Sequence, residues 1–151
     1  MKLNKKNFYF QFIFLYLFSF VNTFSIHHHP RLDSNLLKNT SFLGKNRVLI
    51  LSSKDIEMSK LLKKYKNEEC EIVNRRIVVL LKKDNKYYNL SNNRQETIQK
   101  IISPHKVLLI GLDGNLKFVD DSFSSFKKYF NLIDEMPIRK KEIRFDIECT
   151  E

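Results

Sequence analysis

The sequence predicts an α/β domain with a mixed sheet over residues 47–146. Three features predict this class: short apolar runs typical of strands, segments whose apolar residues recur with helical spacing, and an Asp-Gly pair between two apolar runs. A crossover helix implies that the two strands it joins are parallel, whereas an Asp-Gly turn joins antiparallel strands. The two kinds of connection together predict a mixed sheet.

The first strand and the first helix are predicted at the start of the domain. Arg47–Leu51 is a short apolar run rich in β-favouring residues. Ser52 follows it with Asp55 three positions later, which is similar to a capping box and predicts a helix start. Apolar residues then repeat with the spacing of one helix face, at Met58, Leu61, Leu62 and Tyr65. We therefore expect a helix with one buried face.

A central strand and a second helix are predicted next. Ile77–Leu81 is apolar throughout, as expected of a strand covered on both faces. Tyr87–Leu90 is consistent with a short extended segment. Asn93 with Glu96 three residues later predicts a second helix start, and one face of a helix over 93–102 would carry Ile98, Ile101 and Ile102.

The last third of the domain is predicted to form a hairpin and a helix. The runs Lys106–Leu112 and Asn115–Val119 flank Asp113-Gly114, which favours an antiparallel hairpin with a type I′ turn. A helix capped by Asp121 or Ser122 would place one apolar stripe in the core, made of Phe123, Phe126, Phe130 and Ile133. The resulting order, β-α-β-α-β-β-α, is the thioredoxin-like layout, with helices on both faces of the sheet.

The end of the final helix is predicted from a proline. Proline disfavours helical geometry in the residue before it, so Pro137 should end the helix by about Glu135. We expect Met136 and Ile138 to fold back on the edge of the sheet. The basic residues that follow are expected to stay solvated: Arg139, Lys140 and Lys141.

The N-terminal residues have the pattern of an export signal. Three lysines within residues 1–6 precede Phe8–Val21, a run interrupted only by Gln11 and Ser19, and this length fits the core of a signal peptide. We predict a cleaved signal over residues 1–25, with an uncleaved signal anchor as the alternative. Contact with a membrane is expected only through this segment.

Residues 26–46 are basic and poor in acids, with one acidic residue, Asp33. Such segments resemble organelle transit peptides, and a signal followed by one is the pattern of plastids reached through the secretory route. A disordered spacer is the alternative. We therefore predict the secretory route, with an extracellular or a plastid destination. Residues 147–151 form the C-terminal tail.

Charge and cysteine content set limits on the partners. The chain has a formal net charge of +10, but residues 47–151 hold 21 Lys or Arg against 16 Asp or Glu, so the domain is only mildly basic. No nucleic-acid partner is expected, because neither exposed aromatics nor a groove-reading helix is evident. Cys70 and Cys149 could pair in an oxidising compartment, although Cys149 lies near the chain end, where disorder is usual.

The sequence carries no recognised catalytic, metal or cofactor motif. It has no C-x-x-C, Walker loop, G-x-G-x-x-G, H-E-x-x-H or G-x-S-x-G. The triplet His27–His29 has no further ligands nearby and is interpreted as part of a solvated tail. In thioredoxin-like oxidoreductases the reactive cysteine follows the first strand at a helix N-terminus, but Ser52–Asp55 occupies that position here. We expect no catalytic residue, no metal and no cofactor.

Two further features of the sequence are candidate binding sites. Pro104 precedes the first strand of the hairpin, roughly where thioredoxin-like folds carry a cis-proline that shapes a substrate groove. A cis bond there predicts a peptide-binding edge, whereas a trans turn between elements is the favoured alternative. The basic cluster of Arg139, Lys140, Lys141 and Arg144 could hold phosphate or an acidic partner, or it could form a solvated terminal turn.

Two segments resemble one protein family. The hairpin VLLIGLDGNLKF (107–118) and the tail IDEMPIRKKEIR (133–144) resemble the family called domain of unknown function 4174, which occurs in small exported bacterial proteins and in sushi-repeat extracellular proteins of animals. The resemblance covers Gly44–Asp146, and Leu112 departs from it where the family usually has Lys. It implies a thioredoxin- or peroxiredoxin-like fold without an assigned activity. The motif residues are Gly111, Asp113, Gly114, Lys117, Asp134, Met136, Pro137, Arg139 and Glu142.

The sequence therefore predicts an exported, non-catalytic, thioredoxin-like module that binds a protein partner or serves as a scaffold. Two alternatives stay open. One is a thiol oxidoreductase that uses Cys70, alone or with Cys149. The other is an anion or nucleic-acid binder that uses the basic cluster.

Overall fold

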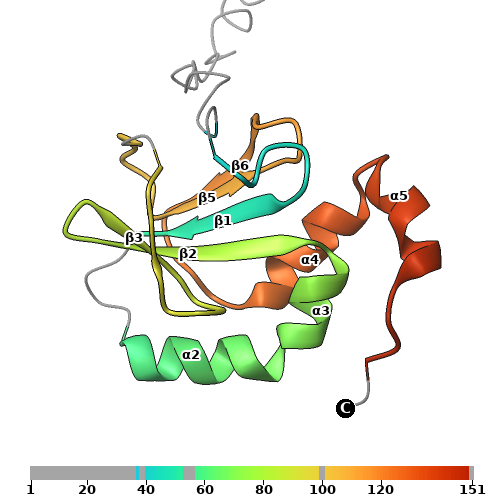
Figure 1. Cartoon of the computed structure of the whole chain (residues 1–151), viewed down its shortest axis with the longest axis horizontal. Coiled ribbons are helices and arrows are strands. Elements are labelled where there is room, and N and C mark those ends of the chain that lie inside the picture. Colours follow the sequence, from blue (N-terminus) through green and yellow to red (C-terminus); the bar gives the residue numbers. More distant parts are fainter. Residues whose placement is uncertain (1–36, 38–39, 53–56, 99–100, 150–151) are drawn as a thin grey trace, which may run out of the picture. The chain divides into compact units, whose positions relative to one another are not determined.

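The computed structural model describes residues 37, 40–52, 57–98 and 101–149. They form one sheet with the strand order β4-β3-β2-β1-β5-β6 (Figure 1). The strands are β1 (Arg47–Leu51), β2 (Ile77–Lys83), β3 (Lys86–Asn89), β4 (Gln95–Glu96), β5 (Val107–Ile110) and β6 (Leu116–Asp120). The helical segments are α2 (Met58–Asn67), α3 (Glu69–Asn74), α4 (Phe126–Asp134), α5 (Arg139–Glu142) and η1 (Ile143–Phe145).

The centre of the sheet confirms the predicted α/β class. β1 pairs in parallel with β2, with Leu49 opposite Val79, and antiparallel with β5, with Leu49 opposite Leu109. The sheet is therefore mixed, and the parallel pair is joined by helices, as the spacing of apolar residues predicts. Strands β2, β1, β5 and β6 have an order and directions consistent with the thioredoxin-like layout.

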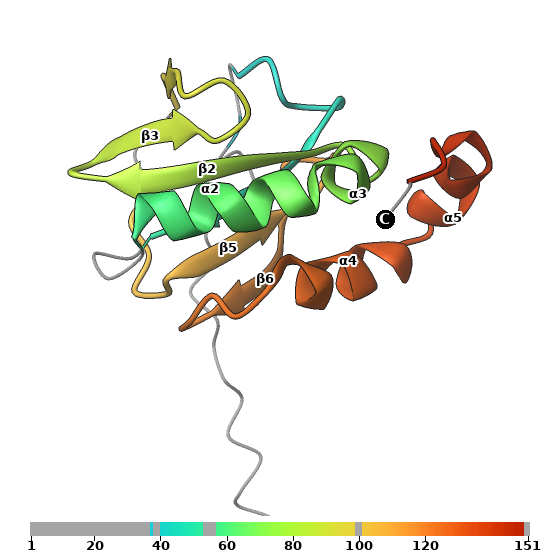
Figure 2. The same ribbon diagram turned by 90° about the horizontal axis from the view of Figure 1, so that it is seen from below.

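The two faces of the sheet are covered differently. Helices α2, α3 and α4 lie on one face, where they bury Leu61, Ile72 and Phe130 against the sheet (Figure 2). Within the described ranges no helix packs on the other face, where irregular segments contribute Phe42 and Ile101 to a second apolar cluster. The expectation of helices on both faces is corrected accordingly.

The predicted helix over 93–102 is not formed by its described residues. Instead Gln95–Glu96 makes the short strand β4, antiparallel to β3, and Asn93 has a positive φ of 54°. The Asn89 side chain accepts hydrogen bonds from Ser91, and the Asn92 side chain accepts one from the Arg94 N–H. Such side-chain hydrogen bonds compete with helix formation and favour turns. Ile98 and Ile101 therefore pack on the sheet from an irregular segment, whereas Ile102 is exposed.

The predicted hairpin is present, but its turn is longer than expected. Val107 lies opposite Asp120 at one end of the β5–β6 pair, and at the other end the Gly111 N–H donates to the Asn115 carbonyl at 2.9 Å. Three residues therefore lie within the turn, and only Gly114 has a positive φ, of 75°. A type I turn followed by a left-handed glycine fits this length, whereas a type I′ turn would require two positive φ angles.

The helices keep their predicted apolar faces but begin later than predicted. α2 begins at Met58 and buries Leu61 and Tyr65, whereas part of its predicted start, residues 53–56, lies outside the described residues. α4 begins at Phe126 rather than near Asp121 and ends at Asp134, which confirms the predicted stop. In the described ranges no helix is long and apolar enough to span a membrane. The predicted signal, residues 1–25, lies outside those ranges.

Candidate functional site

The two motif segments of the sequence line one cavity of about 250 Å³. The β5–β6 hairpin contributes its turn and Lys117, and the connection from α4 to α5 contributes Met136 and Pro137. Arg47, the first residue of β1, also lines the cavity. The full lining is Arg47, Gly111, Leu112, Asp113, Lys117, Met136, Pro137 and Ile138. Tertiary structure thus brings together segments that are separate in the sequence.

The hairpin wall is held by the Asp113 carboxylate. It accepts hydrogen bonds from the Lys117 ammonium at 2.7 Å and from the Asn115 amide nitrogen at 2.9 Å. Partial burial by itself would raise the pKa of Asp113, but the bonds from Lys117 and Asn115 outweigh it, so that the pKa is lowered. A Cβ on Gly111 would lie 2.5 Å from Lys117 Cε. Gly111 therefore leaves the space that the Lys117 side chain occupies.

The opposite wall follows the end of α4. The Met136 N–H donates to the Ile133 carbonyl at 2.9 Å, and the half-buried Met136 side chain packs against the core beneath the helices. This confirms that Met136 is a packing residue. Ile138 was expected to pack as well, but 55% of its surface is exposed. The wall is therefore apolar and open to solvent at Ile138.

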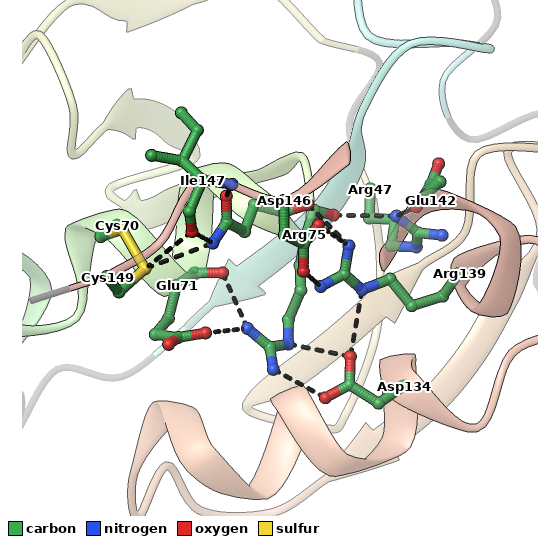
Figure 3. Close-up of polar contacts among 11 residues, drawn as sticks. Arg47, Cys70, Glu71, Arg75, Asp134, Arg139, Glu142, Asp146, Ile147 and Cys149 are labelled. Atoms are coloured by element: carbon green, nitrogen blue, oxygen red, sulfur yellow. Dashed lines mark hydrogen bonds and ion pairs between the residues drawn. A yellow bond between two sulfur atoms is a disulfide. The ribbon is translucent and has the colours of Figure 1, made fainter. Parts of the chain in front are cut away.

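Behind this wall, Arg139 is buried, with 1% of its surface exposed. Its Nε donates to Asp134 at 3.1 Å, and its Nη1 donates to Asp146 at 2.7 Å and to the Asn74 carbonyl at 2.9 Å (Figure 3). The prediction that Arg139 stays solvated is wrong. The partners of Arg139 are thus acidic residues on either side of the basic cluster. The pKa of Arg139 is raised, chiefly by the hydrogen bond with Asp146.

Arg75 extends the same network to α3 and α4. It donates from Nη2 to Asp134 at 2.7 Å and also contacts Glu71. Its guanidinium lies over the ring of Phe130, 4.6 Å from the centroid. Burial alone would lower the pKa of Arg75. The hydrogen bonds with Asp134 and Glu71 outweigh burial, so the pKa is raised. Asp134 is therefore shared by two arginines, Arg75 and Arg139.

Arg47 links this network to the cavity and was not predicted as a site residue. It is also 1% exposed, and its Nη1 donates to Glu142 at 2.9 Å and to the Arg75 carbonyl at 2.8 Å. Its Nε is buried and donates to no acceptor in the described residues. One signal was available in the sequence: a cation begins a strand that is otherwise apolar. A charged group in such a place needs a partner within the fold.

A disulfide between Cys70 and Cys149 ties the end of the chain to α3. The Asn74 side chain adds two hydrogen bonds to the backbone of Ile147, at 2.8 Å to its carbonyl and 2.9 Å from its N–H. The sequence left the pairing open, and proximity to the chain end weighed against it. The structure corrects that expectation, because the tail up to Cys149 is fixed beside α3.

The remaining predicted sites do not come together with the cavity. No peptide bond in the described residues is cis, so Pro104 is trans, as the favoured interpretation of the sequence has it. His105, next to it, forms a hydrogen bond from Nδ1 to Asp121 at 2.7 Å. No cluster of three or more metal-ligating side chains occurs among the residues with described positions. His27–His29 lies outside them.

These features define a small α/β domain whose last turn is held by a buried arginine network and a disulfide, with a cavity between its two motif segments. Residues 39–142 match the family described as Domain of unknown function (DUF4174), and the chain belongs to that family. The resemblance drawn from the hairpin and the tail is thereby confirmed. No curated protein and no solved structure matches the chain.

Proposed function

We propose that this protein is an exported, non-catalytic binding module with a thioredoxin-like core, and that the cavity is its binding site. One observation carries the proposal: the hairpin motif and the tail motif, which define the resemblance, line the same cavity. Concave, largely apolar sites with a few placed polar groups are the usual form of binding sites. The apolar side chains of this cavity are those of Leu112, Met136, Pro137 and Ile138.

The other motif residues support the site from behind. Asp134 and Arg139 fix the turn that carries Met136 and Pro137, while Glu142 holds Arg47 at the cavity. A binding site needs such support, because its side chains must be held in place by packing and by further hydrogen bonds. The motif thus divides into residues that line the cavity and residues that position its walls.

Export is supported by the disulfide. Cross-links of this kind persist in oxidising compartments and are rare in the cytosol, and the chain begins with the pattern of a signal peptide. We propose the secretory route on these two grounds. The destination, extracellular or a plastid reached through that route, is addressed by the reporter experiment described in the Discussion.

The thiol oxidoreductase is the first rival function. The Cys70–Cys149 pair makes it testable, since a dithiol enzyme cycles between the disulfide and two thiols. On our proposal the pair is structural, so the protein reduces neither insulin nor peroxide with turnover. If the wild type shows turnover and Cys70→Ser does not, the protein is a thiol oxidoreductase and the proposed binding module is wrong.

The anion or nucleic-acid binder is the second rival. Arg139 is enclosed by Asp134 and Asp146, whereas Lys140 and Lys141 are exposed. On our proposal, changing both lysines to Ala leaves partner capture intact. A loss of partner together with weaker retention on heparin would favour the anion binder.

The binding module is tested by capture from the protein's own cells. The full chain, expressed with its leader and a C-terminal tag, is cross-linked in place, and its partners are quantified by mass spectrometry. Ile138→Arg alters the cavity at an exposed position, and Ile102→Arg is the matched control, because 79% of Ile102 is exposed away from the cavity. We expect a partner that is lost in Ile138→Arg and kept in Ile102→Arg. Equal capture by both variants would contradict the proposed site.

A further inference from the structure

The end of the domain carries exposed apolar side chains on a short helical stretch. Residues 138–145 are helical throughout, because Ile138 and Ile143, which flank α5, both have right-handed helical backbone angles and η1 follows directly. Figures 1 and 2 show α5 beyond the end of α4 and away from the sheet. Both isoleucines are exposed, as are 81% of Phe145 and 65% of Ile147. Apolar side chains that are exposed close together are typical of an interaction surface.

The charged side chains of the same stretch are sorted by the fold. Its carboxylates bond arginines that are buried: Glu142 pairs with Arg47 at 2.9 Å, and Asp146 pairs with Arg139 at 2.7 Å. The exposed cations form no ion pair within the described part of the chain, and they are Lys140, Lys141 and Arg144. Even with the exposed carboxylate of Glu148, residues 138–148 therefore present an excess of positive charge to solvent.

Helical spacing places cations and apolar side chains on one outward face. Lys141 lies three residues after Ile138 and four before Phe145, and side chains with these spacings are neighbours on a helix. The inward face holds Arg139 and Glu142, which are three residues apart and bonded within the domain. The outward face is therefore apolar and basic at once.

A surface with this composition fits an anionic lipid bilayer. Segments that lie in a membrane interface combine aromatic and aliphatic side chains, which enter the boundary of the acyl chains, with Lys and Arg, which are attracted to anionic lipids. The core of a protein–protein interface, by contrast, is depleted in lysine. The pairing of exposed lysines with Phe145 therefore favours lipid over a protein partner.

We propose that residues 138–147 bind the surface of an anionic lipid bilayer. Phe145 and Ile147 enter the apolar boundary, while the cations contact the lipid phosphates. From the sequence, membrane contact was expected only through the leader, and this surface is a second point of contact. It goes beyond the proposed function, because lipid binds the outward face of α5 and η1 while the partner binds the cavity. Ile138 borders both.

A single tryptophan reports insertion at this surface, since the sequence contains no tryptophan. Phe145→Trp places the probe on the surface, and Ile102→Trp is the matched control, because Ile102 is as exposed but precedes β5. Each full chain, produced through the secretory route, is mixed with vesicles of equal parts phosphatidylcholine and phosphatidylglycerol. We expect a blue shift of emission and quenching by brominated lipid for Phe145→Trp only. Vesicles of phosphatidylcholine alone should produce neither change.

The cations are tested in the Phe145→Trp background. The blue shift should be lost when Gln replaces Lys140, Lys141 and Arg144. The matched control removes the same charge from exposed positions of α2 and α4, with Gln in place of Lys63, Lys66 and Lys127. This control should keep the shift, because those lysines lie on other elements.

Several outcomes would overturn the proposal. No shift for Phe145→Trp excludes lipid insertion, and an equal shift with both kinds of vesicle excludes selection by charge. An equal shift for Ile102→Trp means that the chain adheres through another part, such as the leader. A shift that rises with protein concentration and needs no vesicles assigns the surface to a second copy. If vesicles have no effect but capture of an acidic protein requires the three cations, the occupant is that protein. Capture that depends on Ile138→Arg is a separate readout, so the proposed function is decided independently.

Discussion

Arg139 and Asp146 form an ion pair that joins α5 to the chain just beyond η1, with Nη1 and Oδ1 2.7 Å apart. The same guanidinium bonds Asp134 at the end of α4 and the carbonyl of Asn74 at the end of α3. One buried cation thus holds three segments that approach each other only in the folded chain. The cavity wall at Met136 and Pro137 lies within the loop that this cation closes.

Arg139→Ala is expected to destabilise the domain by about 2 kcal/mol, because it removes charged hydrogen bonds to Asp146 and Asp134, although Asp134 keeps Arg75. The measurement is urea unfolding of the full chain. The matched control is the double change Lys140→Ala and Lys141→Ala, which removes two exposed cations next to it and should cost less than about 0.5 kcal/mol. A larger loss for the double change than for Arg139→Ala would show that the network is not what holds the turn.

Removal of the cross-link by Cys70→Ser with Cys149→Ser is expected to cost about 2–4 kcal/mol, because the disulfide closes a long loop in the unfolded chain. Dithiothreitol should destabilise the wild type by a similar amount and should not affect the double variant. Unchanged stability of the wild type in reductant would contradict a structural role for the bond.

Asp113 is expected to make the hairpin turn sensitive to acid. Its pKa is lowered in the folded state from the usual 3.8, chiefly because bonds from Lys117 and Asn115 outweigh partial burial. A lowered pKa contributes stability that is present above the unfolded value and is lost as pH falls through the folded value. The stability difference between wild type and Asp113→Asn should therefore be constant near neutrality and shrink below about pH 4. A stability difference that grows in acid would contradict a lowered pKa for Asp113 in the folded state.

Met136→Ala is expected to cost about 1–2 kcal/mol, less than a fully buried methionine would, because the side chain is half-buried. Ile138→Ala, at the exposed end of the same wall, should cost less than about 0.5 kcal/mol. Both are measured by chemical denaturation. Equal losses at the two positions would mean that Met136 does not anchor the wall to the core.

The leader is tested with reporter fusions. Residues 1–25 alone should send a fluorescent reporter into the secretory route, because a charge-free apolar run follows basic residues. Residues 1–46 should redirect it to a plastid if 26–46 act as a transit peptide. Arrival of both fusions at the same extracellular location would exclude the plastid, and a cytosolic reporter would exclude the signal.

Much of the fold was predictable, because apolar patterns are local. Arg47–Leu51 and Ile77–Leu81 form strands since unbroken apolar runs must be covered on both faces. The spacing of Leu61 and Tyr65 likewise placed one face of α2 in the core. The segment 93–102 shows the limit of this approach. Its isoleucines have helical spacing, but asparagine side chains stabilise turns before it and the strand β3 offers a partner for Gln95–Glu96.

The candidate site was predictable in its motif residues but not in its arrangement. The sequence by itself determined the α/β class, the hairpin, the end of α4 and the family. The pattern that indicates each of them lies within short stretches of neighbouring residues. Only tertiary structure decided that Arg139 is buried, that Cys70 pairs with Cys149, and that Arg47 and both motif segments line one cavity. The physical reason is that the burial of a charge or a thiol depends on partners distant in the chain, which a local pattern does not encode.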